Sequence, residues 1–180
     1  MGDGEQHHAD YANVSGLNKS ETLQHVIDSF KALSYDTDNW IANLANCASL
    51  LWYGYQSLGV RVNWAGFYVK NSAVAQDELI LGPFQGKVAC QTIAYGRGVC
   101  GKAATTKETQ LVGDVHEFPG HVACDGETNS EIVVPLVKNG EVVAVLDLDC
   151  LDKGGFDEVD QKMLEELAGE IVSECNWDRL

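Results

Sequence analysis

The sequence predicts a single α+β domain in which a set of antiparallel strands lies between helices at both ends of the chain. Apolar residues recur at helical spacing over residues 20–33, 38–58 and 156–171, whereas the middle of the chain holds short runs of β-branched and aromatic residues. Asn139-Gly140 stands between two such runs and is the strongest hairpin signal in the chain. A length of 180 residues, 45% of them hydrophobic, fits one compact domain.

Three long helices are expected where a polar residue precedes apolar positions three and four apart. The first follows Ser20, which can cap it; the second runs from about Asp38 to Gly59, and the last from Phe156 to about Cys175. The residues expected to face the core are Leu23, Val26, Ile27, Phe30 and Leu33 in the first helix, Trp40, Ile41, Leu44, Leu51, Tyr55 and Leu58 in the second, and Phe156, Val159, Met163, Leu164, Leu167 and Ile171 in the last.

The strands are expected between these helices. Val60–Lys70 and Glu78–Leu81 come first, a third strand approaches Cys90, and the hairpin consists of Ile132–Val137 and Val142–Leu148. A glycine-rich turn at 96–98 leads into a short helix. Residues 113–130 are expected to form a long loop, and loops of that length are uncommon unless they serve a function.

The charge of the chain excludes two classes of partner. Twelve Lys and Arg against 27 Asp and Glu give a net charge of −15, which argues against a broad nucleic-acid footprint and against docking on an anionic membrane. The sequence contains no run of 18 apolar residues, so it predicts no membrane-spanning helix. The segment 1–8 lacks the features of a signal peptide, so we expect a cytoplasmic protein, able to reach the nucleus by diffusion, with reduced thiols.

The six cysteines fall into two groups. Cys47 and Cys175 lie on apolar helix faces and Cys150 ends a strand, so these three are interpreted as core residues. The other three, Cys90, Cys100 and Cys124, punctuate irregular, glycine-rich backbone, where reactivity is the better explanation. Two chemistries fit them: a redox-active set of thiols, or a metal site formed with His121. The chain has no C-x-x-C, which is the usual zinc signature, and we expect no metal.

A second set of candidates consists of acids and aromatic residues. Asp147 and Asp149 lie on one face of an otherwise apolar strand, and Glu131 opens the strand before it. Like charges in a buried position raise each other's pKa, so the pair indicates a cation site or a protonated carboxyl, unless that face is solvated. Trp64 and Tyr68 also share one strand face; they form either part of the core or an aromatic wall for a cationic or thioether-like group.

Together these residues closely resemble one family. The strings Asn63–Tyr68, Gly82–Cys90, Gly96–Gly101, His121-x-x-Cys124-Asp125 and Ser130–Pro135 resemble those of free methionine-(R)-sulfoxide reductases, in particular their fungal branch. The likeness runs from about residue 20 to 175. It implies a single GAF-like domain over 18–180, after an N-terminal arm over 1–17, with a central antiparallel sheet and helices packed on its faces. Most GAF domains are ligand sensors, so the three cysteines in their motifs carry the resemblance.

The resemblance also implies the chemistry of the site. Trp64 and Tyr68 would line the methylthio end of a closed pocket, and Glu131, Asp147 and Asp149 would bind the ammonium group and the sulfoxide oxygen. We assign Cys124 as the nucleophile that becomes a sulfenic acid, with Cys90 and Cys100 as resolving residues that could also pair with each other. Cys100 remains a rival nucleophile, since it stands at a predicted helix N-terminus.

The implied partners are free methionine-(R)-sulfoxide as substrate and thioredoxin as external reductant, with no bound cofactor. A homodimer is compatible with the resemblance, although no residue pattern marks an interface. The alternative from another functional class is a GAF-type small-molecule sensor with a cysteine redox switch and no turnover.

Overall fold

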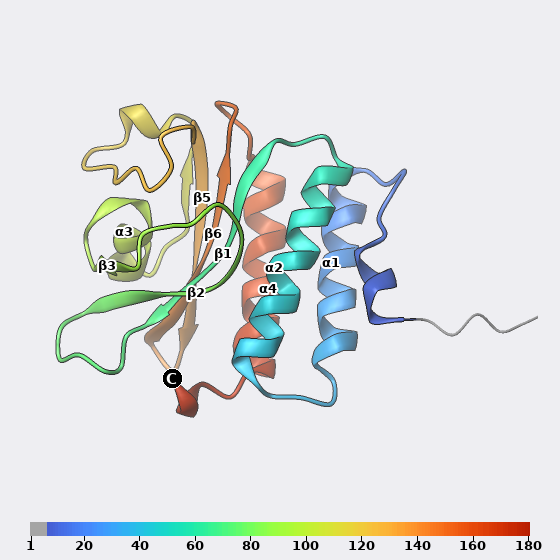
Figure 1. The fold of residues 1–180 in the computed structure, drawn as a ribbon, viewed down its shortest axis with the longest axis horizontal. Coiled ribbons are helices and arrows are strands. Elements are labelled where there is room, and N and C mark those ends of the chain that lie inside the picture. Colours follow the sequence, from blue (N-terminus) through green and yellow to red (C-terminus); the bar gives the residue numbers. More distant parts are fainter. Residues whose placement is uncertain (1–6) are drawn as a thin grey trace, which may run out of the picture.

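The computed structural model describes residues 7–180, which form one antiparallel sheet covered on both faces by helices. The six strands lie in the order β3-β2-β1-β6-β5-β4. Helices α1, α2 and α4 pack side by side on one face of the sheet, whereas α3 and the long loops lie on the other (Figure 1). The predicted α+β class with a central antiparallel sheet is confirmed.

The strands are close to those expected, with one addition. They are β1 Val62–Lys70, β2 Glu78–Gly86, β3 Thr92–Ala94, β4 Gln110–Val112, β5 Ser130–Lys138 and β6 Glu141–Cys150. The β5–β6 turn is made by Asn139 and Gly140, at φ 53° and 81°, as the hairpin signal predicted. The two short strands differ from the prediction. The third strand was expected to approach Cys90, whereas β3 begins after it. β4 was not predicted, because three residues are too few to show a period.

The helices are α1 Lys19–Ser34, α2 Trp40–Ser57, α3 Gly98–Thr106 and α4 Glu158–Glu174. The N-cap of α1 is Asn18 and not Ser20. The Asn18 side chain accepts a hydrogen bond from the backbone N–H of Glu21, and the Glu21 carboxylate accepts one from the backbone N–H of Asn18. Two expected core residues are exposed, Ile41 and Val159, because they lie at the first turns of α2 and α4, where the helix faces solvent on more sides.

Two apolar clusters fill the two faces of the sheet. The larger lies under α1, α2 and α4 and contains Cys47, Cys150 and Cys175, all free thiols, so the interpretation of these three cysteines as core residues is confirmed. The smaller lies between the sheet and α3 and contains Trp64, Tyr68 and Cys100. The redox candidates are therefore separated from the structural cysteines by the sheet itself.

We expect Cys47→Ala and Cys175→Ala to leave unchanged the activity that the family resemblance implies. Both side chains are buried on the face of the sheet opposite to α3, so shrinking them should cost only stability, on the order of 1–2 kcal/mol. Denaturant unfolding together with a sulfoxide-reduction assay checks this. A folded Cys47→Ala protein without activity would contradict this division of the cysteines.

The N-terminal segment is partly described. Residues 1–6 of the predicted arm lie outside the described residues; from His8 to Ala12 the chain forms a 3-10 helix. Tyr11 packs against the larger core cluster, and its carbonyl oxygen lies 2.8 Å from Nε2 of His25 on α1. Two further 3-10 turns, Val115–Glu117 and Trp177–Arg179, follow β4 and α4. None of the helices in the described range has the length and apolar character needed to cross a membrane.

Candidate active site

The site begins with a row of side chains that crosses three strands. Trp64 of β1 stands opposite Asp149 of β6, which stands opposite Glu131 of β5. The next row on the same face is Gly66 and Asp147. Asp147 and Asp149 therefore share a face, as the strand periodicity predicted, and this face is covered by α3 and the long loops and not by solvent. The solvated alternative for this pair is excluded.

The aromatic residues form a wall along one side of the two rows. The rings of Trp64 and Tyr68 are stacked with centroids 5.7 Å apart, and the ring of Phe84 also stacks on Trp64, at 5.2 Å. Gly66, between the first two, is required by close approach: a Cβ there would lie 2.3 Å from Cβ of Phe84. The hydroxyl of Tyr68 donates to the carbonyl oxygen of Cys90 at 2.9 Å, so the wall also supports the loop above it.

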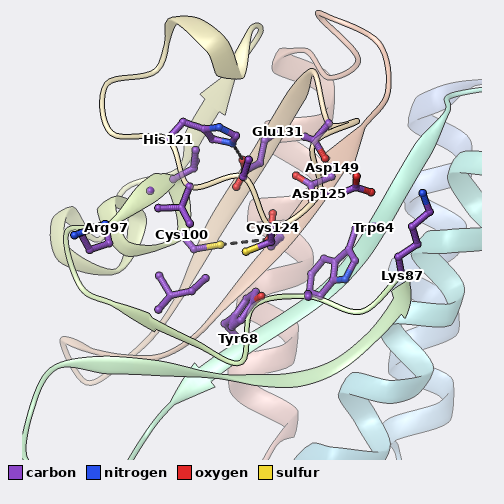
Figure 2. A pocket seen from close by; sticks show the side chains of 18 of the residues that line it. Trp64, Tyr68, Lys87, Arg97, Cys100, His121, Cys124, Asp125, Glu131 and Asp149 are labelled. Atoms are coloured by element: carbon purple, nitrogen blue, oxygen red, sulfur yellow. Dashed lines mark hydrogen bonds and ion pairs between the residues drawn. The ribbon is translucent and has the colours of Figure 1, made fainter.

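These elements enclose a pocket between the sheet, α3 and two loops. Measured out to its open mouth, it holds about 570 Å³ of empty space. Figure 2 shows the side chains arranged around it, with Glu131 and Asp149 on the sheet side, Cys100 on α3 and Cys124 on the loop. Seven of the eight predicted site residues line this one pocket: Trp64, Tyr68, Cys100, Cys124, Glu131, Asp147 and Asp149.

The eighth predicted residue, Cys90, is bonded to Cys124. This disulfide joins the segment after β2 to the loop before β5, with the two Cα atoms 5.5 Å apart. Cys100 is a free, buried thiol. The suggested pairing of Cys90 with Cys100 is therefore not the one present, because Cys100 points down to the sheet from α3 while Cys90 faces the opposite loop.

Two noncovalent contacts hold the same loops, and neither was predicted, because each joins residues far apart in the chain. Lys87 forms an ion pair with Glu127, and the amide group of Asn63 donates to the Asp125 carboxylate and to the Thr128 hydroxyl. The loops thus form a roof over the pocket that is tied at three points, once covalently.

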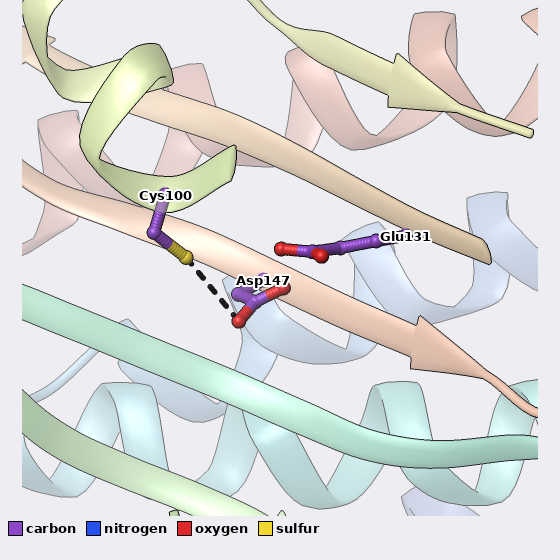
Figure 3. Close-up of side chains that lie close together, drawn as sticks. All are labelled: Cys100, Glu131 and Asp147. Carbon is purple, nitrogen blue, oxygen red and sulfur yellow. Dashed lines mark hydrogen bonds between the residues drawn. The ribbon is translucent and has the colours of Figure 1, made fainter. Parts of the chain in front are cut away.

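A thiol and two carboxyls meet at the floor of the pocket (Figure 3). The Cys100 thiol donates to Oδ2 of Asp147 at 3.3 Å, and one ligand atom each of Cys100, Asp147 and Glu131 lie within 4.8 Å of one another. Burial raises the pKa of the Cys100 thiol well above its ordinary value, and the charges of Asp147 and Glu131 raise it further. The thiol is therefore protonated, although Cys100 is the third residue of α3, where the helix dipole favours a thiolate.

The three acids share one electrostatic situation. Burial raises the pKa of Glu131, Asp147 and Asp149 well above the usual range, and the charge of a neighbouring acid raises each of these pKa values further. His121 lies 3.5 Å from the Glu131 carboxylate, and burial lowers the pKa of its imidazole. A pocket with this many buried acids holds protons more tightly than exposed acids do, and it favours a cationic ligand or one that accepts a hydrogen bond from a protonated carboxyl.

The zinc alternative named four ligands: Cys90, Cys100, His121 and Cys124. The structure does not assemble that set, because two of its members are bonded to each other. Cys100, Glu131 and Asp147 are the residues at ligand distance.

Two polar atoms in the pocket lack a hydrogen-bond partner within the described residues: Nε1 of Trp64 and Oδ1 of Asp147, both buried. Leaving a buried donor or acceptor unpaired costs roughly 1–3 kcal/mol. One donor and one acceptor left open in the same pocket match a ligand that carries groups of both kinds.

Comparison with known proteins shows the family to which this fold and pocket belong. The family model described as GAF domain matches residues 48–173, which run from within α2 to near the end of α4. The free methionine-R-sulfoxide reductase of Saccharomyces cerevisiae is 57% identical over 171 residues, 94% of either chain. That of Escherichia coli is 43% identical over 155 residues, 86% of this chain and 89% of its own.

A solved structure agrees with these relatives. The free methionine-R-sulfoxide reductase of Neisseria meningitidis in complex with its substrate superposes with a TM-score of 0.83 at 39% identity, covering 93% of this chain and 96% of that one. This chain belongs to the free methionine-R-sulfoxide reductases of the GAF-domain class. The predicted resemblance is confirmed.

Proposed function

We propose that this protein reduces free L-methionine-(R)-S-oxide to L-methionine, with Cys124 as nucleophile. The observation that carries the proposal is the Cys90–Cys124 disulfide in the roof of a pocket whose floor is lined by acids. A sulfoxide needs a thiol above its sulfur and a proton donor beside its oxygen. Both are present in one pocket.

The substrate fits the pocket by its two ends. The stacked rings of Trp64 and Tyr68 offer an apolar, polarisable surface to the methylthio group. Glu131, Asp147 and Asp149 supply the carboxyls for the ammonium group and the sulfoxide oxygen. A protonated carboxyl, Glu131 or Asp149, would donate to that oxygen. With Glu131 as that donor, Asp149 and the open Nε1 of Trp64, which lie in one cross-strand row, would receive the ammonium and carboxylate groups of the amino acid.

The reaction proceeds in two thiol steps. The Cys124 thiolate attacks the sulfoxide sulfur, the sulfoxide oxygen takes up protons and passes to Cys124, and methionine leaves, so that the substrate is reduced by two electrons and Cys124 becomes a sulfenic acid. The Cys90 thiol then condenses with the sulfenic acid, releases water and forms the disulfide. An external dithiol, thioredoxin, returns the two electrons. The reaction calls for no bound cofactor.

The environment of Cys100 supports Cys124 as nucleophile. Cys100 is buried, and its thiol is held protonated as a donor to Asp147. A protonated thiol is a poor nucleophile. From its position on α3, Cys100 can orient the Asp147 carboxyl. It can form a disulfide with Cys124 only after the loop that carries Cys124 moves.

A coupled assay tests the proposed function. Reduced thioredoxin, thioredoxin reductase and NADPH are mixed with the protein and free methionine-(R)-sulfoxide. We expect NADPH oxidation in proportion to methionine formed, and none with the (S) epimer. The alternative, a GAF-type sensor with a cysteine switch, predicts a single round of oxidation without sustained turnover. Absence of turnover with both thioredoxin and dithiothreitol would favour the sensor.

A further inference from the structure

The two cysteines of the disulfide stand in the same tripeptide. Val88-Ala89-Cys90 and Val122-Ala123-Cys124 come from segments 34 residues apart, and the disulfide joins them at their last residue. Each cysteine is thus preceded, two positions earlier, by a valine. Both valines border the pocket, but neither carries a group that reacts, so the mechanism proposed above gives them no part in the chemistry.

Val88 faces solvent, whereas Val122 is partly covered where it packs against Gly98 at the start of α3. Val88 is 88% exposed, the highest value among the large hydrophobic residues of the described range, and Val122 is 37% exposed. Neighbouring positions of the roof are charged and exposed, such as Lys87 and Glu127, which neutralise each other in an ion pair. A single exposed valine is ordinary on a protein surface. Val88, however, stands two residues from a disulfide that a reducing partner must reach, and that partner can cover an apolar side chain there.

The disulfide limits what that partner is. Its two sulfurs differ in access: Cys124 is exposed, whereas Cys90 is half-buried under the Tyr68 hydroxyl that binds its carbonyl oxygen. Thiol–disulfide exchange requires a thiolate to approach one sulfur while the other leaves. A protein that delivers this thiolate must rest on the surface around Cys124, and that surface includes the two valines.

We propose that Val88 and Val122 form an apolar rim on which a dithiol reductase of the thioredoxin type docks, and that its thiolate attacks Sγ of Cys124. The proposal rests on the function proposed above. A bond forms between the partner's sulfur and Cys124, the Cys90–Cys124 bond breaks, and Cys90 leaves as a thiolate that takes a proton. The partner's second thiol then displaces Cys124, so that the partner leaves oxidised by two electrons.

The small net charge of the rim supports this partner. The whole chain carries −15, a field that repels an acidic protein at long range. At the rim Lys87 offsets Glu127, which leaves the neighbouring Asp125 carboxylate uncompensated, so close docking depends mainly on apolar contact, which salt does not screen. We therefore expect the rate of reduction to rise with salt and then level off.

The test measures reduction of the preformed Cys90–Cys124 disulfide, without any sulfoxide. Reduced thioredoxin is mixed with the oxidised protein, and the appearance of free thiols gives the second-order rate constant. We expect Val88→Asp to lower this rate constant at least about tenfold, because the substitution places a charge in an apolar contact. Val88→Leu should keep the rate constant of the wild-type protein. Reduction by dithiothreitol should stay within about twofold of the wild-type rate.

Val159→Asp is the matched control, since Val159 is 43% exposed and lies on α4, across the sheet from the disulfide. If the Val88→Asp protein is reduced by thioredoxin as fast as this control, the proposal that the rim is a docking site is wrong. Equal losses with thioredoxin and dithiothreitol would also overturn it, because the side chain would then act on the disulfide itself. Since no sulfoxide is present, failure here is distinct from failure of the proposed function.

The attacked sulfur is tested separately. A thioredoxin variant without its second thiol should be trapped as a mixed disulfide, and peptide mass spectrometry locates it. We expect the partner on Cys124. Trapping mainly on Cys90 would contradict the direction of attack.

Discussion

Replacing Cys124 with serine is expected to reduce turnover of free methionine-(R)-sulfoxide by more than about 1,000-fold and to leave the fold intact. A serine hydroxyl cannot form the sulfenic acid, and loss of a nucleophile removes the whole covalent route. The side chain is exposed in the roof, so no core contact is lost. Single-turnover production of methionine from the prereduced protein, with circular dichroism as the check on folding, measures the effect.

Two serine variants serve as controls. Cys90→Ser should still produce one equivalent of methionine, and the sulfenic acid on Cys124 should then persist long enough for dimedone to trap it, because its resolving thiol is gone. Cys100→Ser should also retain single turnover, since a hydroxyl can still donate to Asp147. If Cys124→Ser keeps near-normal single turnover while Cys100→Ser does not, the assignment of the nucleophile is reversed.

The second large effect is expected from blocking the substrate's amino group. N-acetylation removes the positive charge and adds bulk at the row formed by Trp64, Asp149 and Glu131. A buried carboxylate would lose its partner, which costs roughly 3–5 kcal/mol. At about 1.4 kcal/mol per tenfold change, kcat/KM should fall by two to three orders of magnitude.

Peptide-bound methionine sulfoxide should react no faster than the acetylated compound. It carries the same amide and needs two exits for its chain, whereas the roof is tied across the pocket by the Lys87–Glu127 pair and by the bonds of Asn63. The measurement compares free, N-acetylated and peptidyl methionine-(R)-sulfoxide under thioredoxin recycling. Comparable rates on all three would indicate an open groove and would remove the acids from the role of amino-acid ligands.

Much of this protein was predictable from local patterns. The alternation in Val142–Asp149 placed two acids on one face, Asn139-Gly140 placed the hairpin, and the apolar helix positions of Cys47 and Cys175 separated structural from reactive cysteines. The sequence strings also identified the family. These features depend on residues within one turn or one strand, whose periodicity is readable along the chain.

The tertiary structure decided what depends on residues distant in sequence. The register of β1, β6 and β5 aligned Trp64, Asp149 and Glu131 in one row, and no single strand carries that information. The packing of α3 buried Cys100 against Asp147, so desolvation outweighed the helix dipole and raised the pKa of the thiol. Only the folded chain brought Cys90 to Cys124, since a disulfide forms between the Cβ atoms that the fold brings into range, whatever their spacing in sequence.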